Sequence, residues 1–524
     1  MGMENVGWLY EFLVAKAAEI SAAGSQRAAV ISISLFVSLL CVCIVIGHYY
    51  EENRWLNQAT IAIILGCAVG FVIYILSNNA ELLSFDEQLL FIYLLPPIIF
   101  NAGFQVKKKQ FFHNFGTIML FGGSGVLISA SIVTAGCRYM FPRLKLGNLQ
   151  MRDYLALGTI FSATDTVATL QLLHQDETPL LYSLVFGEGV VNDATAVVLF
   201  RAVQRFEEAG LDGKAALRMI YEFVYLFSVS TVLGVVIGLI AAYVLKSLYF
   251  GKHSTDKEIA LMALMAYLSY MLAELFQWSG ILSVFFCGIF MSHYGWHNVS
   301  GSSKITSKHA FATFSSISES FMFLYVGTNV FNVNIWQLVD VRAASLSCAM
   351  LLALTSLGRA AFVFPMSAIS NYARGSSSVK LRFRHQVIIW WSGIMRGAVS
   401  IALAYQQFST SSGTMNTDYA TMIYSTTGVV LFTTLVVGVV TKPLIATLLP
   451  HHLRHLEPSS PKDESCEEAN EDGSSIFLRR SSLSMLLANP TSAVHSLWRG
   501  FDDSYMRPFF GGGGPVRDSD AWEA

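Results

Sequence analysis

Charged residues are scarce in this sequence. Asp, Glu, Lys and Arg make up only 13% of its 524 residues, whereas apolar residues make up 53%. So small a charged fraction excludes an ordinary soluble domain, in which about a quarter of the residues are charged. The formal net charge of −2 gives no sign of a nucleic-acid partner. The composition predicts an all-α polytopic membrane protein.

Cysteine and histidine form no recognisable site. None of the seven cysteines stands at zinc-ligand spacing, and nothing in their placement suggests a disulfide framework. An intramembrane hydrolase would need a nucleophile with its base, or a metal cluster, and the apolar segments contain neither pattern. The sequence therefore predicts a protein that is not an enzyme and has no cofactor.

Apolar runs long enough to cross a bilayer recur along the chain. A helix rises about 1.5 Å per residue, so roughly 20 apolar residues cross the hydrocarbon core. By this length we count about 13 transmembrane helices. They lie near residues 29–48, 57–77, 88–105, 116–141, 153–173, 180–203, 219–248, 258–276, 278–294, 309–330, 343–370, 386–408 and 418–445.

Basic residues in the short loops predict the orientation. The loops after the third and eleventh spans are rich in Lys and Arg, whereas those after the second, eighth and twelfth contain none. By the positive-inside rule, the loops after odd-numbered spans and the C-terminal tail are cytosolic. We divide the chain into an N-terminal interfacial segment (1–28), a transmembrane domain (29–450) and a cytosolic regulatory tail (451–524).

The tail has its own composition. Residues 457–475 are polar and acidic, which predicts a disordered linker. Residues 476–510 mix apolar residues with arginines. This second pattern fits a membrane-surface segment, a calmodulin-type target or a tail that only associates non-specifically.

The stretch Gly187–Ala194 places two carboxylates and an amide in the middle of a long apolar run. Ionisable residues at membrane depth are costly and mark ion or proton paths by default. Glu188 and Asn192 are four residues apart and share one helix face, with Asp193 on the adjoining flank. The alternative is a structural polar cluster that holds helices together.

Two spans carry signs of interrupted helices. In the fifth span, Ser162–Thr166 clusters side chains that compete for backbone hydrogen bonds, and Asp165 can neutralise positive helix ends. In the twelfth, Gly393–Ser400 combines two glycines with a buried cation, Arg396. Polar, interrupted segments in corresponding positions of two halves predict inverted repeats with two crossed broken helices. Spans one to six and eight to thirteen are the expected repeats.

Arg359 lies deep in the apolar eleventh span, where a cation needs a partner. Glu188 is the best candidate for this partner, because Asp165 and Asp193 are expected to interact with cations. In the third span, Pro96 and Pro97 remove two backbone donors in mid-membrane. These prolines indicate either a structural kink or a part of the ion funnel.

Taken in order, the stretches Phe91–Phe100, Ser162–Thr166, Gly187–Ala194 and Gly393–Ser400 resemble the monovalent cation/proton antiporters. The chain looks most like the plant vacuolar Na+(K+)/H+ exchangers, and the resemblance reaches Phe501–Pro508 in the tail. It covers nearly the whole chain.

The resemblance implies a homodimer of subunits with thirteen spans. A static dimerisation part is expected near residues 29–105 and 258–330. A mobile core that carries the ion is expected near residues 116–203 and 343–445.

The resemblance also implies roles for individual residues. Asp193 would bind the cation, Na+ or K+, or a proton in turn, and Asn192 would be its neutral neighbour. Thr164 and Asp165 would sit at the crossed broken helices. The supporting charges would be the Glu188–Arg359 ion pair and, on the second broken helix, Arg396. The stretch associated with amiloride-type inhibitors corresponds to Phe91, Tyr93, Leu94, Pro96, Pro97 and Phe100.

The expected function is electroneutral Na+(K+)/H+ antiport at the vacuolar membrane, the tonoplast, driven by the lumenal proton gradient. The expected partners are a second copy of the chain, membrane lipid, and calmodulin or another regulator at the tail. One alternative is a K+-preferring endosomal exchanger that regulates pH. Another is a cation channel, which would need a continuous pore lined by rings of carbonyls or charges.

Overall fold

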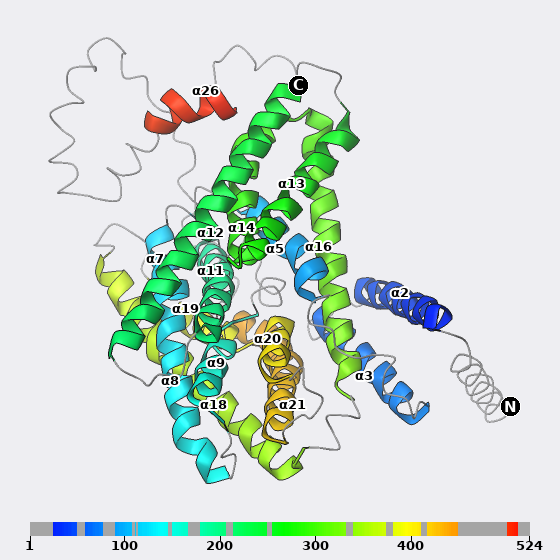
Figure 1. Ribbon diagram of the computed structural model, residues 1–524, viewed down its shortest axis with the longest axis vertical. Helices are drawn as coiled ribbons and strands as arrows, with labels where there is room; N and C mark the ends of the chain where they lie inside the picture. The colour runs from blue at the N-terminus through cyan, green and yellow to red at the C-terminus, as the bar shows by residue number, and fades with distance from the viewer. Residues whose placement is uncertain are drawn as a thin grey trace. The chain divides into compact units, whose positions relative to one another are not determined.

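The computed structural model of the chain consists of helices, and no β-strand occurs in the residues that it describes. Those residues are 25–49, 58–76, 90–106, 111, 114–144, 149–165, 179–205, 213–248, 254–331, 339–373, 381–409, 417–448 and 500–511. Figure 1 follows the chain from α2 (Ser25–Tyr49) to α26 (Arg507–Phe510). The all-α prediction is confirmed for this part of the chain. Residues 1–24 of the predicted interfacial segment 1–28 and most of the tail fall outside it, whereas residues 25–28 belong to α2.

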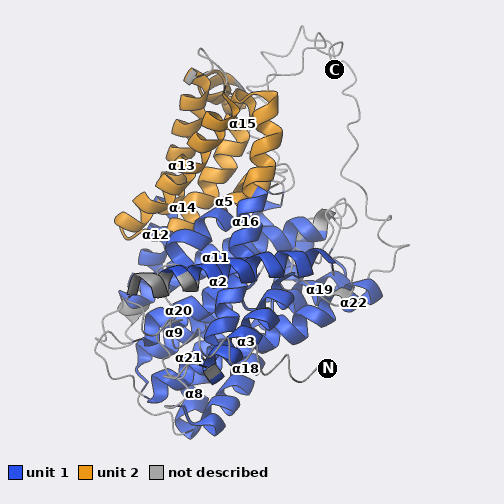
Figure 2. Cartoon of the chain, turned by 90° about the vertical axis from the view of Figure 1, so that its right-hand side faces the viewer, with its two compact units in different colours: residues 1–99, 109–229, 312–451 blue, residues 100–108, 230–311, 452–524 orange. Residues whose placement is uncertain are grey.

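The helices form two compact units, which are coloured separately in Figure 2. Unit 1 comprises residues 1–99, 109–229 and 312–451, and unit 2 comprises residues 100–108, 230–311 and 452–524. The predicted division into a mobile core and a dimerisation part uses other boundaries. That division concerns movement and dimer contacts, and it stays a prediction.

Unit 1 holds most of the helices. Besides α2, these are α3 (Gln58–Leu76), η2 (Leu90–Leu94), α7 (Phe115–Met119), η3 (Leu120–Ser124), α8 (Gly125–Met140), η4 (Phe141–Leu144), α9 (Met151–Ile160), α11 (Pro179–Gln204), α18 (Val341–Ala373), α19 (Phe383–Ser392), α20 (Ala398–Phe408), α21 (Thr417–Phe432), η6 (Thr433–Val437) and α22 (Gly438–Leu448).

Unit 2 is smaller. Besides α26, it holds α13 (Thr255–Leu275), α14 (Gly280–Phe290), η5 (Met291–Gly295), α15 (Trp296–Asn298) and η7 (Asp502–Met506). Three helices contribute residues to both units: α5 (Leu95–Gln105), α12 (Gly213–Leu248) and α16 (Gly301–Asn329).

All thirteen predicted ranges overlap described helices. Among the described residues, seven helices are long and apolar enough to cross a membrane unaided. The others include half-helices such as α9 and α20, with 10 and 11 residues, which are too short to cross a bilayer alone. The total of 13 spans therefore stays a prediction. The division between the eighth and ninth spans is confirmed: α13 ends at Leu275, Gln277 adopts a φ of 57°, and α14 starts at Gly280.

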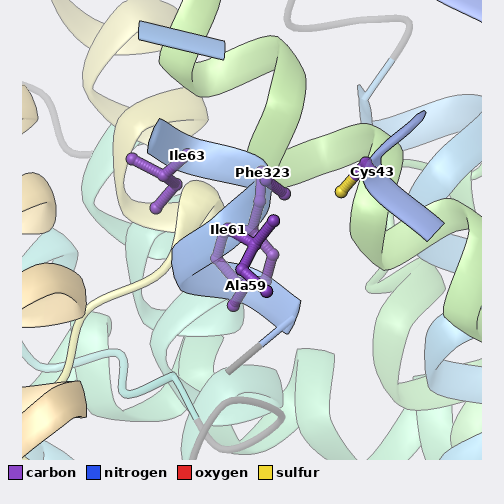
Figure 3. Close-up of a cluster of buried hydrophobic side chains, with 6 residues drawn as sticks. Cys43, Ala59, Ile61, Ile63 and Phe323 are labelled. Atoms are coloured by element: carbon purple, nitrogen blue, oxygen red, sulfur yellow. The ribbon is translucent and has the colours of Figure 1, made fainter. Parts of the chain in front are cut away.

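A core of buried apolar side chains joins α2, α3 and α16 in unit 1. Figure 3 shows Cys43, Ile61 and Phe323 among its members. The helices approach so closely that a Cβ on Gly66 of α3 would lie 2.5 Å from the carbonyl oxygen of Leu324. Glycine is thus required there by the close backbone approach, since any side chain would push α3 away from α16.

Both predicted helix breaks are present. α9 ends at Ile160 and is followed by irregular backbone up to Asp165; the continuation of this span lies outside the described residues. α19 ends at Ser392, and α20 begins at Ala398 after five non-helical residues. Segments that leave the helical conformation at membrane depth must find other backbone partners within the protein. In this chain these partners form the candidate site.

The two prolines of the third span do not interrupt it. Pro96 and Pro97 are the second and third residues of α5, which directly follows the π-helical turn η2. A π-helical turn alters the hydrogen-bond register just before the prolines, so their missing N–H groups are accommodated without a gap between the helices.

Candidate ion-binding site

Helix α11 carries three polar side chains of the candidate site. Glu188 and Asn192 are buried, and Asp193 is half-buried. α11 packs closely on the π-helical turn η3, because a Cβ on Gly122 would lie 2.8 Å from the Cβ of Val191. This packing holds α11 beside two arginines, Arg359 of α18 and Arg396 of the break after α19.

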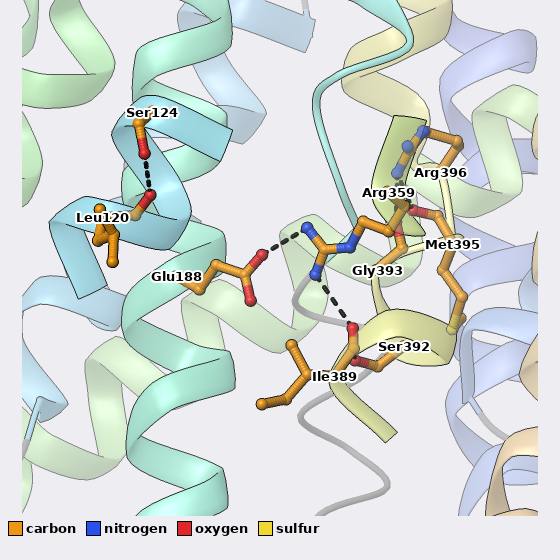
Figure 4. Close-up of polar contacts among 9 residues, drawn as sticks. All are labelled: Leu120, Ser124, Glu188, Arg359, Ile389, Ser392, Gly393, Met395 and Arg396. Carbon is orange, nitrogen blue, oxygen red and sulfur yellow. Dashed lines mark hydrogen bonds and ion pairs between the residues drawn. The ribbon is translucent and has the colours of Figure 1, made fainter. Parts of the chain in front are cut away.

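Glu188 and Arg359 are brought together. The Glu188 carboxylate Oε1 pairs with Nη1 of Arg359 from α18, and both side chains are almost completely buried (Figure 4). Nη2 of Arg359 donates to the carbonyl of Ile389 at 3.1 Å, in the last turn of α19. The last carbonyls of a helix have no partner within it and carry partial negative charge. One guanidinium thus joins α11 to the end of α19.

Gly393, the residue after α19, makes room for this arginine. A Cβ at this position would lie 1.9 Å from the guanidinium carbon of Arg359. The first glycine of the predicted break is therefore required by the close approach of a charged side chain. The guanidinium also lies over the ring of Phe362, whose centroid is 5.0 Å from the same carbon.

Arg396 lies in the break itself and is completely buried. Its Nη1 donates to the carbonyls of Gly393 at 2.7 Å and of Met395 at 3.0 Å. The arginine thereby satisfies carbonyls that the interrupted helix leaves free. Its charge also interacts with the carboxylates of Asp165 and Asp193.

The two breaks are joined by hydrogen bonds to backbone carbonyls. The N–H of Asp165 donates to the carbonyl of Met395 at 3.0 Å, and Oγ of Ser400 donates to the carbonyl of Ile160 at 3.2 Å. A Cβ on Gly397 would lie 3.0 Å from the carboxyl carbon of Asp165. The Asp165 carboxylate thus lies at the N-terminus of α20, where a helix favours negative charge. Thr164, which lies beside Asp165 in the break after α9, is also buried.

The outer ends of the same two half-helices are also joined. Asp153, in the first turn of α9, accepts hydrogen bonds from Nε2 of Gln407 at 3.0 Å and from the Tyr419 hydroxyl at 3.4 Å. Ser400 and Ile160 meet at one end of the pair and Gln407 and Asp153 at the other. α9 and α20 therefore run antiparallel and are held at both ends.

The charges of this cluster do not cancel. Three carboxylates, those of Asp165, Glu188 and Asp193, interact with Arg396, and Arg359 supplies the second guanidinium. One negative charge is left over among these described residues. Of the three acids, only Asp193 is partly exposed; the other two are buried. One monovalent cation or one proton would balance this formal charge, and Asp193 is the most exposed of the three acids.

Comparison with known proteins agrees with this arrangement. Residues 31–447 match the family described as sodium/hydrogen exchanger, transmembrane. The chain belongs to the sodium/hydrogen exchanger family. Sodium/hydrogen exchanger 4 of Arabidopsis thaliana is 55% identical, over 93% of this chain and 96% of the relative. Sodium/hydrogen exchanger 1 of rice (Oryza sativa subsp. japonica) is 54% identical over 94% of both chains.

The structural comparison identifies the fold. The sodium proton antiporter MjNhaP1 of Methanocaldococcus jannaschii superposes with a TM-score of 0.59 over 82% of this chain and 99% of its own, at 15% sequence identity. The predicted antiporter fold is thus confirmed. The relatives are named exchangers, which are transporters rather than enzymes. The roles of the individual site residues stay predictions.

The stretch predicted to meet amiloride-type inhibitors does not present one uniform surface. Leu94, Pro96 and Phe100 are buried, whereas Tyr93 is 65% exposed. Phe91 and Pro97 are half-buried. An inhibitor that contacted all six residues would have to meet both an exposed and a buried side of this helix.

Two residues of this exchanger that the sequence did not single out support the second break. Thr433 and Thr434 open the π-helical turn η6. Thr433 Oγ1 accepts a hydrogen bond from the N–H of Arg396 at 3.2 Å, and Thr434 Oγ1 donates to the carbonyl of the same residue at 3.4 Å. An adjacent threonine pair within an apolar run is the only sequence signal, because the π-helical turn that aims them is not visible in the sequence.

Replacing Thr433 or Thr434 by valine is expected to destabilise the break. Valine keeps the shape but leaves one buried backbone group of Arg396 without a partner, at a cost of about 1–3 kcal/mol. We expect a lower melting temperature in detergent and slower exchange in vesicles. Thr427→Val is the matched control, because Thr427 donates only to Ile423 of its own helix, at 3.0 Å. Equal effects of the three substitutions would show that the break does not depend on the threonine pair.

Proposed function

We propose that this exchanger moves one Na+ or K+ in one direction for each proton that it moves in the other. The observation that carries the proposal is the single uncompensated negative charge of the buried cluster. One carboxylate that holds either a proton or a metal cation makes the two ions compete. Competition at one site couples their movements in opposite directions.

Asp193 is the proposed binding carboxylate. It is partly exposed, and its charge interacts with that of Arg396. Asp165 and Thr164, in the first break, would complete the cation's oxygen ligands together with free backbone carbonyls. Asn192 cannot ionise, so only one proton is exchanged per cation.

Transport would proceed by alternating access. The two half-helices α9 and α20 are held together at both ends, so they would move as one body with the ion. The dimerisation parts of two copies of the chain would together form the static part of the dimer. The proton gradient of an acidic vacuole would then drive Na+ or K+ into its lumen.

The experiment that tests the proposed function uses proteoliposomes loaded with a pH-sensitive dye. An outward Na+ or K+ gradient is expected to drive protons inward without building up a membrane potential. Each cation is tested separately, so the same assay reports the preference between them. A cation gradient that creates a potential without moving protons would instead indicate a channel.

A further inference from the structure

The chain's last described segment packs on other helices of unit 2. Asp502 of η7 is buried, accepts a hydrogen bond from the Tyr294 hydroxyl at 2.6 Å and pairs with Nε of Arg507 at 3.0 Å. Nδ2 of Asn298 donates to the carbonyl of Phe510 at 2.7 Å and to the carbonyl of Ala242 in α12 at 2.9 Å. The segment (α26 is red in Figure 1) therefore has a defined inner face.

The outer face of the same segment is aromatic. Phe501, Tyr505 and Phe509 recur every four residues and so share one side of a helix; they are 47%, 69% and 59% exposed. Phe501 and Tyr505 stack on each other with ring centroids 5.6 Å apart. Three large aromatic side chains gathered on one exposed face indicate an interaction surface.

This face continues the exposed surface of a membrane-spanning helix. The phenol ring of Tyr243 in α12 stacks on Phe509, with ring centroids 5.4 Å apart. From Tyr243 toward the N-terminus of α12, exposed apolar side chains recur at helical spacing at Ile240, Val236 and Val232. α12 contains a 28-residue apolar stretch, Ile220–Ser247, that is long enough to cross a bilayer. The exposed apolar side of a spanning helix is expected to meet lipid, and the aromatic face continues this side at the end of the stretch.

The hydrogen bonds of Lys246 hold α26 at this end of α12. Its Nζ donates to the carbonyls of Pro508 at 2.6 Å and of Phe509 at 3.4 Å. Lysine near the end of a spanning helix directs its amino group to the interface, and tyrosine is enriched at the same depth. Both markers of the membrane–water interface thus contact α26 directly.

We propose that residues 501–510 form a membrane-surface anchor whose aromatic face, Phe501, Tyr505 and Phe509, lies in the lipid headgroup layer. The partner is the bilayer itself at the end of α12. The buried Asp502 and the half-buried Lys246 hold the segment to the protein, and the aromatic face holds it to the lipid. The anchor fastens the tail beside the transmembrane domain.

The test places a photoreactive benzoylphenylalanine at Tyr505 of the full-length chain in liposomes. We expect illumination to attach lipid to the peptide that contains position 505, as measured by mass spectrometry. The same probe at Phe510, which faces inward and lies 6.3 Å from Tyr294 between ring centroids, is the control. There we expect attachment within the chain and severalfold less lipid.

Three results would overturn the proposal. Attachment of position 505 to a second copy of the chain would make the aromatic face a dimer contact. Absence of lipid products at position 505 would place the face in water. Equal lipid attachment at positions 505 and 510 would mean that the segment has no defined lipid-facing side. Because the probe at position 505 replaces an exposed aromatic residue by another aromatic one, the folded structure is preserved there.

Discussion

Asp193→Asn is expected to abolish Na+/H+ exchange while the protein stays folded. The amide has nearly the same shape as the carboxylate, but it neither releases a proton nor offers a full negative charge to a cation. The substitution also leaves the remaining charges balanced, since Asp165 and Glu188 then face Arg359 and Arg396 one for one. The measurement is cation-driven proton movement in proteoliposomes, with the melting temperature as the check on folding.

Asp256→Asn is the matched control for Asp193→Asn. Asp256 is exposed in the first turn of α13 and does not belong to the charge cluster, so the same chemical change is made without altering the charges of the cluster. We expect its exchange rate to equal that of the unmodified protein. If the Asp193 variant kept half or more of the exchange activity, another residue would have to be the competing carboxylate.

Loss of either partner of the Glu188–Arg359 pair is expected to be the most damaging change to stability. Removal of one member strands a buried charge, which costs about 3–5 kcal/mol. Arg359→Ala additionally removes the hydrogen bond to Ile389 and the contact with Phe362. The double substitution is expected to cost less than the sum of the two single ones, because it leaves no unpaired charge from this pair.

A double-mutant cycle on unfolding in detergent measures this coupling. The control cycle uses Arg205 and Glu222, whose side chains form an exposed ion pair at 3.5 Å. Exposed pairs contribute about 0–1 kcal/mol, so this cycle should be close to additive. Additive effects at Glu188 and Arg359 as well would show that their contact contributes nothing to stability.

The sequence was most informative where membrane burial makes polar residues expensive. Asp165 and Arg396 stood out because nothing in an apolar span can solvate them, and both lie at helix breaks in the structure. The partner of Arg359 followed from the same reasoning. Gly393 was predicted to mark a helix break. The structure shows that glycine is required there because the guanidinium of Arg359 occupies the space that a Cβ would need, and the sequence does not reveal this contact.

Features that depend on geometry could not be predicted. Thr433 and Thr434 act through a π-helical turn, and such turns have no reliable sequence pattern. The contact between Asp165 and Met395 joins segments 230 residues apart through backbone atoms alone, so the side chains carry no trace of it. In the tail, the sequence pointed to the arginines as the functional residues. The structure shows that a buried acid, Asp502, holds the described segment in place.

One-for-one exchange is tested most directly by the dependence of transport on membrane potential. Na+-driven proton movement is measured in vesicles clamped with a K+ ionophore, first at zero and then at about 100 mV. A net transfer of one charge per cycle would change the driving force by about 2.3 kcal/mol over 100 mV. We expect equal rates at both potentials for the unmodified protein, in which Asn192 stays neutral. For Asn192→Asp we expect a stalled exchanger, because two adjacent acids hold the extra proton tightly. A strong dependence on potential in the unmodified protein would contradict the one-for-one mechanism.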